Sequence, residues 1–304
     1  RTLTEQRTAW AHEATEVLGG PDTATAMVKA ALSPTINPAV AEVDPAWLRA
    51  TASTIVSTLQ ETRSTWQVWH VRAEAQRRIR AADLPGDEVE AVADLLVDEV
   101  LTTRSVRITR PQDDINEPEE LRRGDGSSVY EVAGSALFTS AAILAAEQHM
   151  VDAAGRRDGR TASQEAVAIA LLEQAANGVT LNAGQAALVA GMATSGARLQ
   201  LAIAPAGTGK TTAMRALAAA WDADGGTVIG LAPSAAAAAV LREQLSAGTD
   251  TLAKLVWSIA HHDLPDWAQN IGPKTLVVVD EAGMADTLSL AAAVDFVIGR
   301  GGSV

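Results

Sequence analysis

A glycine-rich turn between an apolar run and a helix-forming segment constrains this chain more than any other stretch. The apolar residues 199–204 lead directly into the sequence PAGTGKTT, and helix formers continue through Ala220. A strand, a glycine-rich loop and a helix in this order favour a phosphate-binding loop, because the glycines let backbone N–H groups converge on a polyphosphate. An ordinary glycine-rich connection is the alternative, which the flanking pattern disfavours.

The loop offers a group for each part of a nucleoside triphosphate. Its predicted nucleotide-binding residues are Pro205, Ala206, Gly207, Thr208, Gly209, Lys210, Thr211 and Thr212. Lys210 is expected to reach the β- and γ-phosphates, and the Thr211 hydroxyl is expected to hold Mg²⁺. Ala204 stands where the motif G-x-x-x-x-G-K-[ST] has its first glycine, which is a change of one methyl group. The sequence therefore predicts a nucleotide site.

An acidic pair follows a later apolar run. Residues 275–279 read TLVVV and precede Asp280 and Glu281. Ligands of open α/β sheets bind at the carboxyl ends of the strands, so both carboxylates are expected beside the phosphate loop. We predict that Asp280 holds Mg²⁺ through water, and that Glu281 orients and deprotonates the attacking water. A solvated acidic turn is the alternative.

The same acidic segment, residues 280–283, also fits the D-x-x-G motif of GTPases. A GTPase needs an Asn/Thr-Lys-x-Asp tetrad to read guanine, and none follows in the sequence. Glu281 beside Asp280 is typical of ATPases, so ATP and Mg²⁺ are the expected cofactors. A P-loop kinase that phosphorylates a small acceptor is a further alternative, which the paired carboxylates disfavour.

Apolar strands that alternate with helices predict an α/β fold for residues 179–304, an incomplete RecA-like P-loop NTPase domain with a parallel sheet. The expected strands are residues 199–204, 227–232 and 275–280. Helices are expected after Asn182, after the phosphate loop, from 235 to 245, from 251 to 259 and from 287 to 297, with a loop at 264–272.

The upstream sequence divides into two parts. Residues 1–100 are expected to form a helical region, with apolar residues at helical spacing over 1–18 and 45–80. Trp66 and Trp69 lie three positions apart and should share a helix face, where burial is favoured over a platform for stacking bases. Residues 101–178 are expected to form a small α+β connecting segment, with strands at 105–108 and 127–132 and helices at 141–154 and 163–176.

Composition narrows the function classes. The 304 residues suffice for about two domains, and the absence of cysteine excludes disulfides and cysteine-ligated metals. The net charge of −13 argues against general coating by nucleic acid, but it allows a strand to be gripped in a local channel. The uncharged run 174–197 contains polar residues and glycines, so no membrane span is expected. A cytoplasmic location is the expectation.

Three stretches resemble motifs of superfamily-1 helicases. Residues 181–185, LNAGQ, look like the Q-motif, and the resemblance implies that the Gln185 amide reads adenine. Residues 230–235, GLAPSA, look like motif Ia, and residues 251–255, TLAKL, look like the next DNA-contact motif. The resemblance implies contacts with single-stranded DNA at Pro233, Ser234, Thr251 and Leu252. Each stretch alone also fits a plain connection or a capped helix.

Together these motifs resemble the RecD-like branch of superfamily 1, and within it the helicase portion of MobF-class conjugative relaxase-helicases. The stretches TWQVWHVRAEAQRRIR and LRRGDGSSVYEVAGSALFTSAAILAAEQ are similar to the region that joins relaxase to helicase in that family. The resemblance implies an ATP-driven motor that translocates 5′ to 3′ along single-stranded DNA during conjugative transfer. A nucleotide-binding or DNA-docking module without hydrolysis is the alternative.

Two departures from the family limit what the resemblance implies. A relaxase needs a three-histidine metal site and catalytic tyrosines, whereas Tyr130 is the single tyrosine and the five histidines do not form that pattern. The family's sensor motif, second RecA-like domain and arginine finger are expected beyond Val304. An arginine finger is worth about 10³–10⁵ in rate, so the chain alone is expected to bind nucleotide and hydrolyse it weakly.

Overall fold

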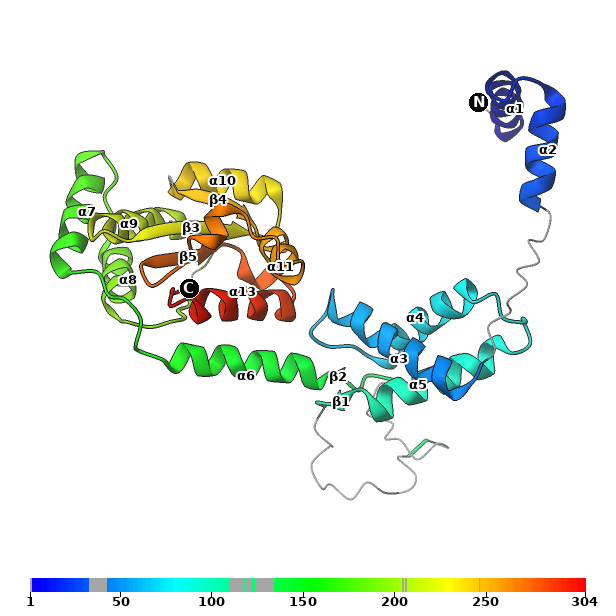
Figure 1. Ribbon diagram of the computed structural model, residues 1–304, viewed down its shortest axis with the longest axis horizontal. Coiled ribbons are helices and arrows are strands. Elements are labelled where there is room, and N and C mark those ends of the chain that lie inside the picture. Colours follow the sequence, from blue (N-terminus) through cyan, green and yellow to red (C-terminus); the bar gives the residue numbers. More distant parts are fainter. Residues whose placement is uncertain are drawn as a thin grey trace.

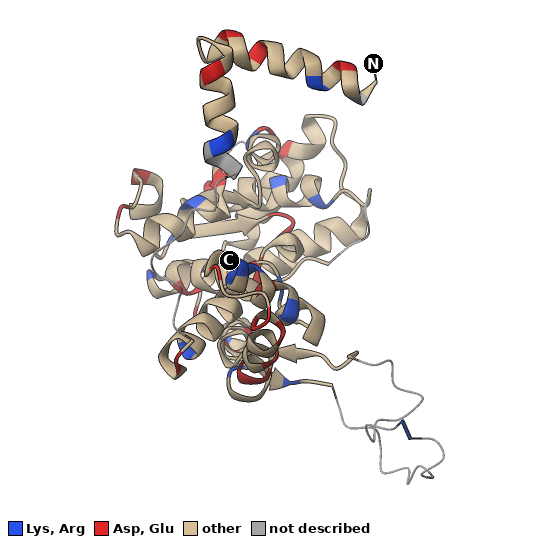
Figure 2. Ribbon diagram, turned by 90° about the vertical axis from the view of Figure 1, so that its right-hand side faces the viewer, with Lys and Arg blue, Asp and Glu red and all other residues tan. Residues whose placement is uncertain are grey.

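The chain forms a helical part and an α/β part, with a long helix running between them (Figure 1). The computed structural model describes residues 2–32, 43–109, 118, 122–123, 134–203, 205, 207–245 and 247–304. Within those ranges no helix is both long and apolar enough to cross a membrane. Figure 2 shows acidic and basic residues interspersed over the helices on one side of the molecule.

The amino-terminal part is helical. Its helices are α1 (Leu3–Val17), α2 (Pro21–Leu32), α3 (Pro45–Gln60), α4 (Val68–Ala81) and α5 (Val89–Thr103). Caps fix several starts: Thr2 and Glu5 form a capping box at α1, and Asp44 accepts a hydrogen bond from the Trp47 N–H at α3. The apolar faces of α3, α4 and α5 meet in one core, whose fully buried side chains include Ile55, Val71, Ile79, Leu96 and Val100.

The break between α3 and α4 corrects the continuous helical stretch expected over residues 45–80. Trp66 lies in this break and exchanges two backbone hydrogen bonds of 2.8 Å with Phe138. Its side chain is fully buried, and its indole N–H donates to Ser105 Oγ at 3.1 Å. The expected burial of Trp66 is confirmed. The shared helix face with Trp69 is wrong, because α4 begins only at Val68 and Trp69 is 43% exposed.

A two-stranded antiparallel ribbon links this core to the long helix. Strand β1 (Val106–Arg107) lies within the expected strand 105–108, but it pairs with β2 (Phe138–Thr139). The expected partner, residues 127–132, lies outside the described residues. Helix α6 (Ala141–Gly155) then starts as expected, because Ser140 Oγ accepts a hydrogen bond from the Ile143 N–H at 3.1 Å.

The carboxyl-terminal part is built on three parallel strands in the order β4-β3-β5. Its elements are α7 (Gln164–Ala176), α8 (Ala183–Thr194), α9 (Lys210–Ala223), β3 (Thr227–Ala232), α10 (Ala235–Leu245), β4 (Gly248–Thr251), α11 (Leu252–Ala260), α12 (Asp266–Gln269), β5 (Thr275–Val279), η2 (Ala282–Met284) and α13 (Thr287–Gly299). Successive β3 residues face opposite sides: Val228 and Ala232 pack with α7–α10, whereas Ile229 and Leu231 pack with α11–α13. Helices therefore cover both faces, as predicted for a parallel α/β sheet.

The strand expected at residues 199–204 is wrong for the described part, residues 199–203. Gln200 donates its backbone N–H to the Val304 carbonyl at 2.9 Å, and the Val304 N–H donates to the Arg198 carbonyl at 2.8 Å. Ser303 bridges to Leu276 of β5, so residues 303–304 lie between β5 and this segment. Beyond Gln200 the segment has no ladder partner in the described chain, and Leu201 and Ile203 are 73% and 85% exposed.

Two short elements of the carboxyl-terminal part, β4 and α12, were not expected. Strand β4 reads GTDT, which carries no apolar signal, and its pairing with residues 229–232 of β3 defines it. The helix α12 lies within the expected loop 264–272.

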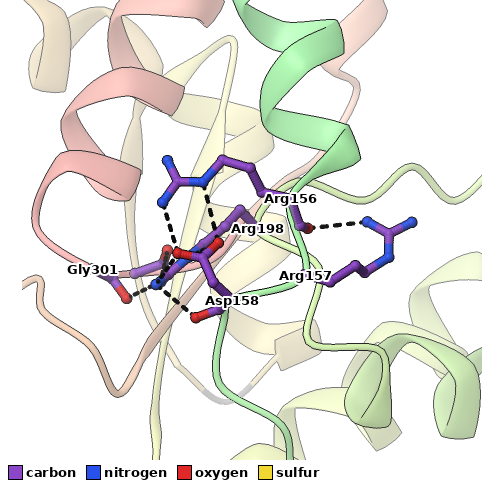
Figure 3. Close-up of polar contacts among 6 residues, drawn as sticks. Arg156, Arg157, Asp158, Arg198 and Gly301 are labelled. Carbon is purple, nitrogen blue, oxygen red and sulfur yellow. Dashed lines mark hydrogen bonds and ion pairs between the residues drawn. The ribbon is translucent and has the colours of Figure 1, made fainter.

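Hydrogen bonds from Arg198 hold the connection between α6 and α7 against the α/β part (Figure 3). Its guanidinium donates to the Asp158 carbonyl at 2.9 Å and to the Gly302 carbonyl at 3.1 Å, and it also bonds the Gly301 carbonyl. The Asp158 carboxylate in turn accepts hydrogen bonds from Arg156 at 2.8 Å and from Arg198 at 3.2 Å. These hydrogen bonds hold the pKa of Asp158 well below its usual range. The hydrogen bond from Arg156 has the largest effect, and the one from Arg198 comes next.

Trp66→Ala tests the core of the helical part. We expect the free energy of unfolding to fall by about 3–5 kcal/mol, because truncation of a buried tryptophan leaves a large cavity. Urea titration followed by circular dichroism measures the change, with Trp69→Ala as the partly exposed control. Equal losses in the two variants would contradict the assigned positions of the tryptophans.

Asp158→Asn tests the junction. A depressed folded-state pKa stabilises the protein above the unfolded pKa of about 3.9, and the effect is lost as pH falls through that value toward the folded pKa. We therefore expect wild type to melt above Asp158→Asn at neutral pH and the difference to shrink below about pH 4. Thermal unfolding at a series of pH values measures it, with the exposed Asp263→Asn as control. A difference in melting temperature that stays the same at every pH would contradict this explanation.

Candidate nucleotide-binding site

The glycine-rich loop has backbone angles that only glycine adopts without strain. Gly207 and Gly209 have φ of +75° and +76°, in the left-handed region. Gly209 is also the residue before α9, which begins at Lys210. The loop therefore turns sharply into a helix N-terminus, the geometry that directs backbone N–H groups toward an anion. Ala204 and Ala206 lie outside the described residues.

The polar side chains of the loop turn back onto its own carbonyls. Thr208 Oγ1 donates to the Pro205 carbonyl at 2.7 Å, and Lys210 Nζ donates to the same oxygen at 3.2 Å. The lysine ammonium therefore lies within the loop. Thr211 and Thr212 follow in the first turn of α9, both partly buried.

Gln185 of α8 lies directly against the loop. Asn182 and Gln185 form a capping box, in which the Asn182 N–H donates to Gln185 Oε1 at 2.8 Å. The same amide donates through Nε2 to the Thr208 carbonyl at 2.9 Å. A Cβ at Gly209 would collide with Gln185 Nε2, so a side chain at this position would displace the amide, in addition to the strain of its backbone angle. The cap thus holds the amide against the phosphate loop.

Asp280 and Glu281 follow the last residue of β5. The Asp280 N–H donates to the Leu231 carbonyl of β3 at 2.9 Å, which extends the ladder by one residue. Asp280 Oδ1 accepts the Glu281 N–H at 3.0 Å, and Glu281 adopts a left-handed conformation with φ of +49°. Residues other than glycine rarely take this backbone conformation. The Glu281 side chain is exposed, and the Asp280 side chain is partly exposed.

These groups fit a nucleoside triphosphate with Mg²⁺. The glycine turn leaves the backbone open to an anion, and Lys210 supplies a cation beside it. Thr211 offers a hydroxyl and Asp280 a carboxylate, which are the hard oxygen ligands that Mg²⁺ prefers alongside phosphate oxygens. Within the described ranges no group of three or more histidine, aspartate or glutamate side chains could hold a metal by itself.

The residues expected to contact DNA lie at the carboxyl ends of β3 and β4. Ser234 Oγ accepts the Ala237 N–H at 3.1 Å before α10, and Thr251 Oγ1 accepts the Lys254 N–H at 3.1 Å before α11. Pro233 is partly exposed, and Ala232 pairs with Thr251 in register, so both loops share one edge. Leu252 needs a correction, because the residue is only 4% exposed and packs in the core, so its side chain cannot meet a strand there.

A cavity lies between the helical part and the carboxyl edge of the sheet. It measures about 360 Å³ and is lined by residues 61–65, after α3, and by residues 283–287, after Glu281. The segment that follows the acidic pair therefore faces the helical part. No periodicity or motif relates these two loops, so their proximity could not be predicted from the sequence.

Gly209→Ala tests the loop. We expect nucleotide affinity to fall at least about tenfold, because a β-carbon at positive φ costs about 1–2 kcal/mol and here also displaces Gln185. Titration with a fluorescent ATP analogue measures the affinity. Gly225→Ala is the matched control, since Gly225 has φ of +74° but open space around its Cβ position and lies at the far end of α9. Equal effects of the two substitutions would contradict a special role for Gly209.

Comparison with known proteins places this geometry in context. Residues 180–304 match the family model described as an AAA domain. A probable conjugal transfer protein TraA of Sinorhizobium fredii (strain NBRC 101917 / NGR234) is 36% identical over 96 residues, which cover 31% of this chain and 8% of the relative. The conjugal transfer protein TraA of Rhizobium radiobacter is 34% identical over 110 residues, or 36% of this chain and 9% of the relative.

The aligned part is therefore under a tenth of either relative. The match to an AAA domain covers every residue of the phosphate loop and the acidic pair Asp280-Glu281. The carboxyl-terminal part of the chain is accordingly similar to a nucleotide-binding AAA domain, and part of the chain is similar to conjugal transfer proteins.

Proposed function

We propose that this chain is the ATP-binding motor portion of a DNA helicase that acts in conjugative DNA transfer. The proposal includes a RecA-like fold for residues 179–304 and translocation from 5′ to 3′ along single-stranded DNA. It also includes a longer parent protein that contributes a second RecA-like domain and a relaxase. The similarity to two conjugal transfer proteins supports the biological setting.

The contact of Gln185 with the phosphate loop carries this proposal. The Gln185 amide bonds the Thr208 carbonyl at 2.9 Å, although 22 residues separate the two in sequence. A phosphate loop alone would fit many classes of nucleotide-binding protein. An amide fixed at its edge by a capping box is the group that would read a base attached to the bound phosphates.

Each polar group of the site has a role in this proposal. Lys210 binds the β- and γ-phosphates, and the Gln185 amide pairs with adenine. Thr211 and Asp280 hold Mg²⁺, which neutralises charge on the phosphate oxygens when it is bound. Glu281, exposed after β5, orients a water molecule and accepts its proton.

The proposed position of the single-stranded DNA follows from the carboxyl edge of the sheet. Ser234 follows β3 by two residues and Thr251 ends the adjacent strand β4, at the edge where Asp280 also lies. A strand that contacts Pro233, Ser234 and Thr251 would therefore lie near the acidic pair, so that a change at the nucleotide could alter the grip on DNA. The helical residues 1–100 and the connecting residues 101–178 are proposed as separate regions that precede the motor.

Substitutions at two charged residues test the motor. We expect Lys210→Ala to abolish ATP binding, since the loop loses its cation. We expect Glu281→Gln to bind ATP as wild type does but to slow turnover about 10²–10⁴-fold, because the amide cannot accept the proton. Steady-state phosphate release with and without single-stranded DNA, together with titration of a fluorescent ATP analogue, measures both effects.

The exposed Lys274→Ala and Glu243→Gln are matched controls of the same charge. ATP binding without any hydrolysis, in this chain and in a carboxyl-terminally extended version with DNA, would favour the non-hydrolysing docking module instead. Wild-type behaviour of both site variants would refute the site assignment.

A further inference from the structure

The exposed face of α11 carries an aromatic pair that no step above uses. Trp257 is 53% exposed, and the ring of His261 stacks on it with centroids 4.1 Å apart and planes 19° from parallel. His261 Nδ1 lies 2.8 Å from the Trp257 carbonyl, which fixes the imidazole in place. The imidazole therefore lies over one face of the indole and holds the ring in an ordered position.

Helix geometry defines what surrounds these rings. Leu252, Leu255 and Ser258 are buried on the inner face of α11, whereas Ala253, Lys254, Trp257 and His261 are exposed. His261 lies one turn after Trp257 and covers one side of the indole. Ala253 lies one turn before it, and a methyl group leaves room above the other side of the ring.

Charge beside the platform matches a nucleotide unit. Lys254, three residues before Trp257, lies on the same face, and its side chain is 52% exposed. Its ammonium is 2.9 Å from Asp250 Oδ2, and this ion pair holds the lysine at the amino-terminal end of the platform. Asp250 takes one of the three donors of this ammonium, and the other two can meet a phosphate beside a base that stacks on the indole.

The position of α11 is also suitable. The helix begins at Thr251, which ends β4 opposite Ala232 at the carboxyl edge of the sheet. Figure 1 shows α11 beside α13 at one end of the α/β part. A strand that passes Ser234 and Thr251 would reach the exposed face of α11 next.

We propose that Trp257, backed by His261, is a stacking platform for one unpaired base of single-stranded DNA. This inference rests on the proposed function and adds a base contact to it. The platform is isolated, because its exposed neighbours on the helix are alanine, lysine and histidine, and one indole suits a single flat base better than a broad protein surface. A stacked base gives grip without sequence preference.

The test compares a labelled oligothymidylate with the same oligonucleotide carrying abasic sites, measured by fluorescence anisotropy. We expect Trp257→Ala to weaken binding of the intact strand about 5- to 150-fold, the range for loss of one stacked base. It should leave binding of the abasic strand unchanged. Trp257→Phe should restore most of the affinity, and His261→Ala should cause a smaller loss than Trp257→Ala.

Trp10→Ala is the matched control, since Trp10 is 61% exposed on α1. Thermal unfolding and binding of the fluorescent ATP analogue should be unchanged in every variant. Wild-type protein that binds DNA as tightly as Trp257→Ala does would overturn the platform while leaving the motor proposal intact. Wild-type protein that binds ATP but no single-stranded DNA would overturn both proposals.

Discussion

Parallel pairing along β3 is the constraint on which the site depends. β3 pairs with β5 on one side and with β4 on the other, in registers that place Leu231 opposite Val279 and Ala232 opposite Thr251. Parallel strands end at the same edge of a sheet, so the pairing brings Asp280 and Thr251 to one edge. The backbone N–H of Asp280 donates to the Leu231 carbonyl of β3. The acidic pair therefore starts on the sheet itself.

Three further devices hold the phosphate loop and its flanking segments in place. Glycines with positive φ let the phosphate loop turn into α9. The capping box at the start of α8 holds the Gln185 amide against that loop. Residues 303–304 bridge β5 to the segment that precedes the loop. Each device uses backbone hydrogen bonds, which are costly to leave unmade in a folded protein. The site is therefore held mainly by main-chain geometry, and the side chains that would do chemistry remain partly exposed.

Several contacts between described residues join the helical part and α6 to the α/β part. Arg198 and Asp158 fasten the connection after α6, and Leu288 of α13 packs against the core formed by α3, α4 and α5. The cavity between residues 61–65 and 283–287 lies beside the contact of Leu288 and directly follows Glu281.

The sequence by itself determined the phosphate loop, the acidic pair, the cap at Asn182 and most helices, because short-range backbone preferences and apolar periodicity specify them. It predicted strands β3 and β5, which are apolar over most of their length, but not β4, whose polar residues become a strand only through pairing with β3. Tertiary structure decided the partner of Trp66 and the contact of Gln185 with Thr208. These contacts join residues far apart in the chain, and no local pattern encodes them.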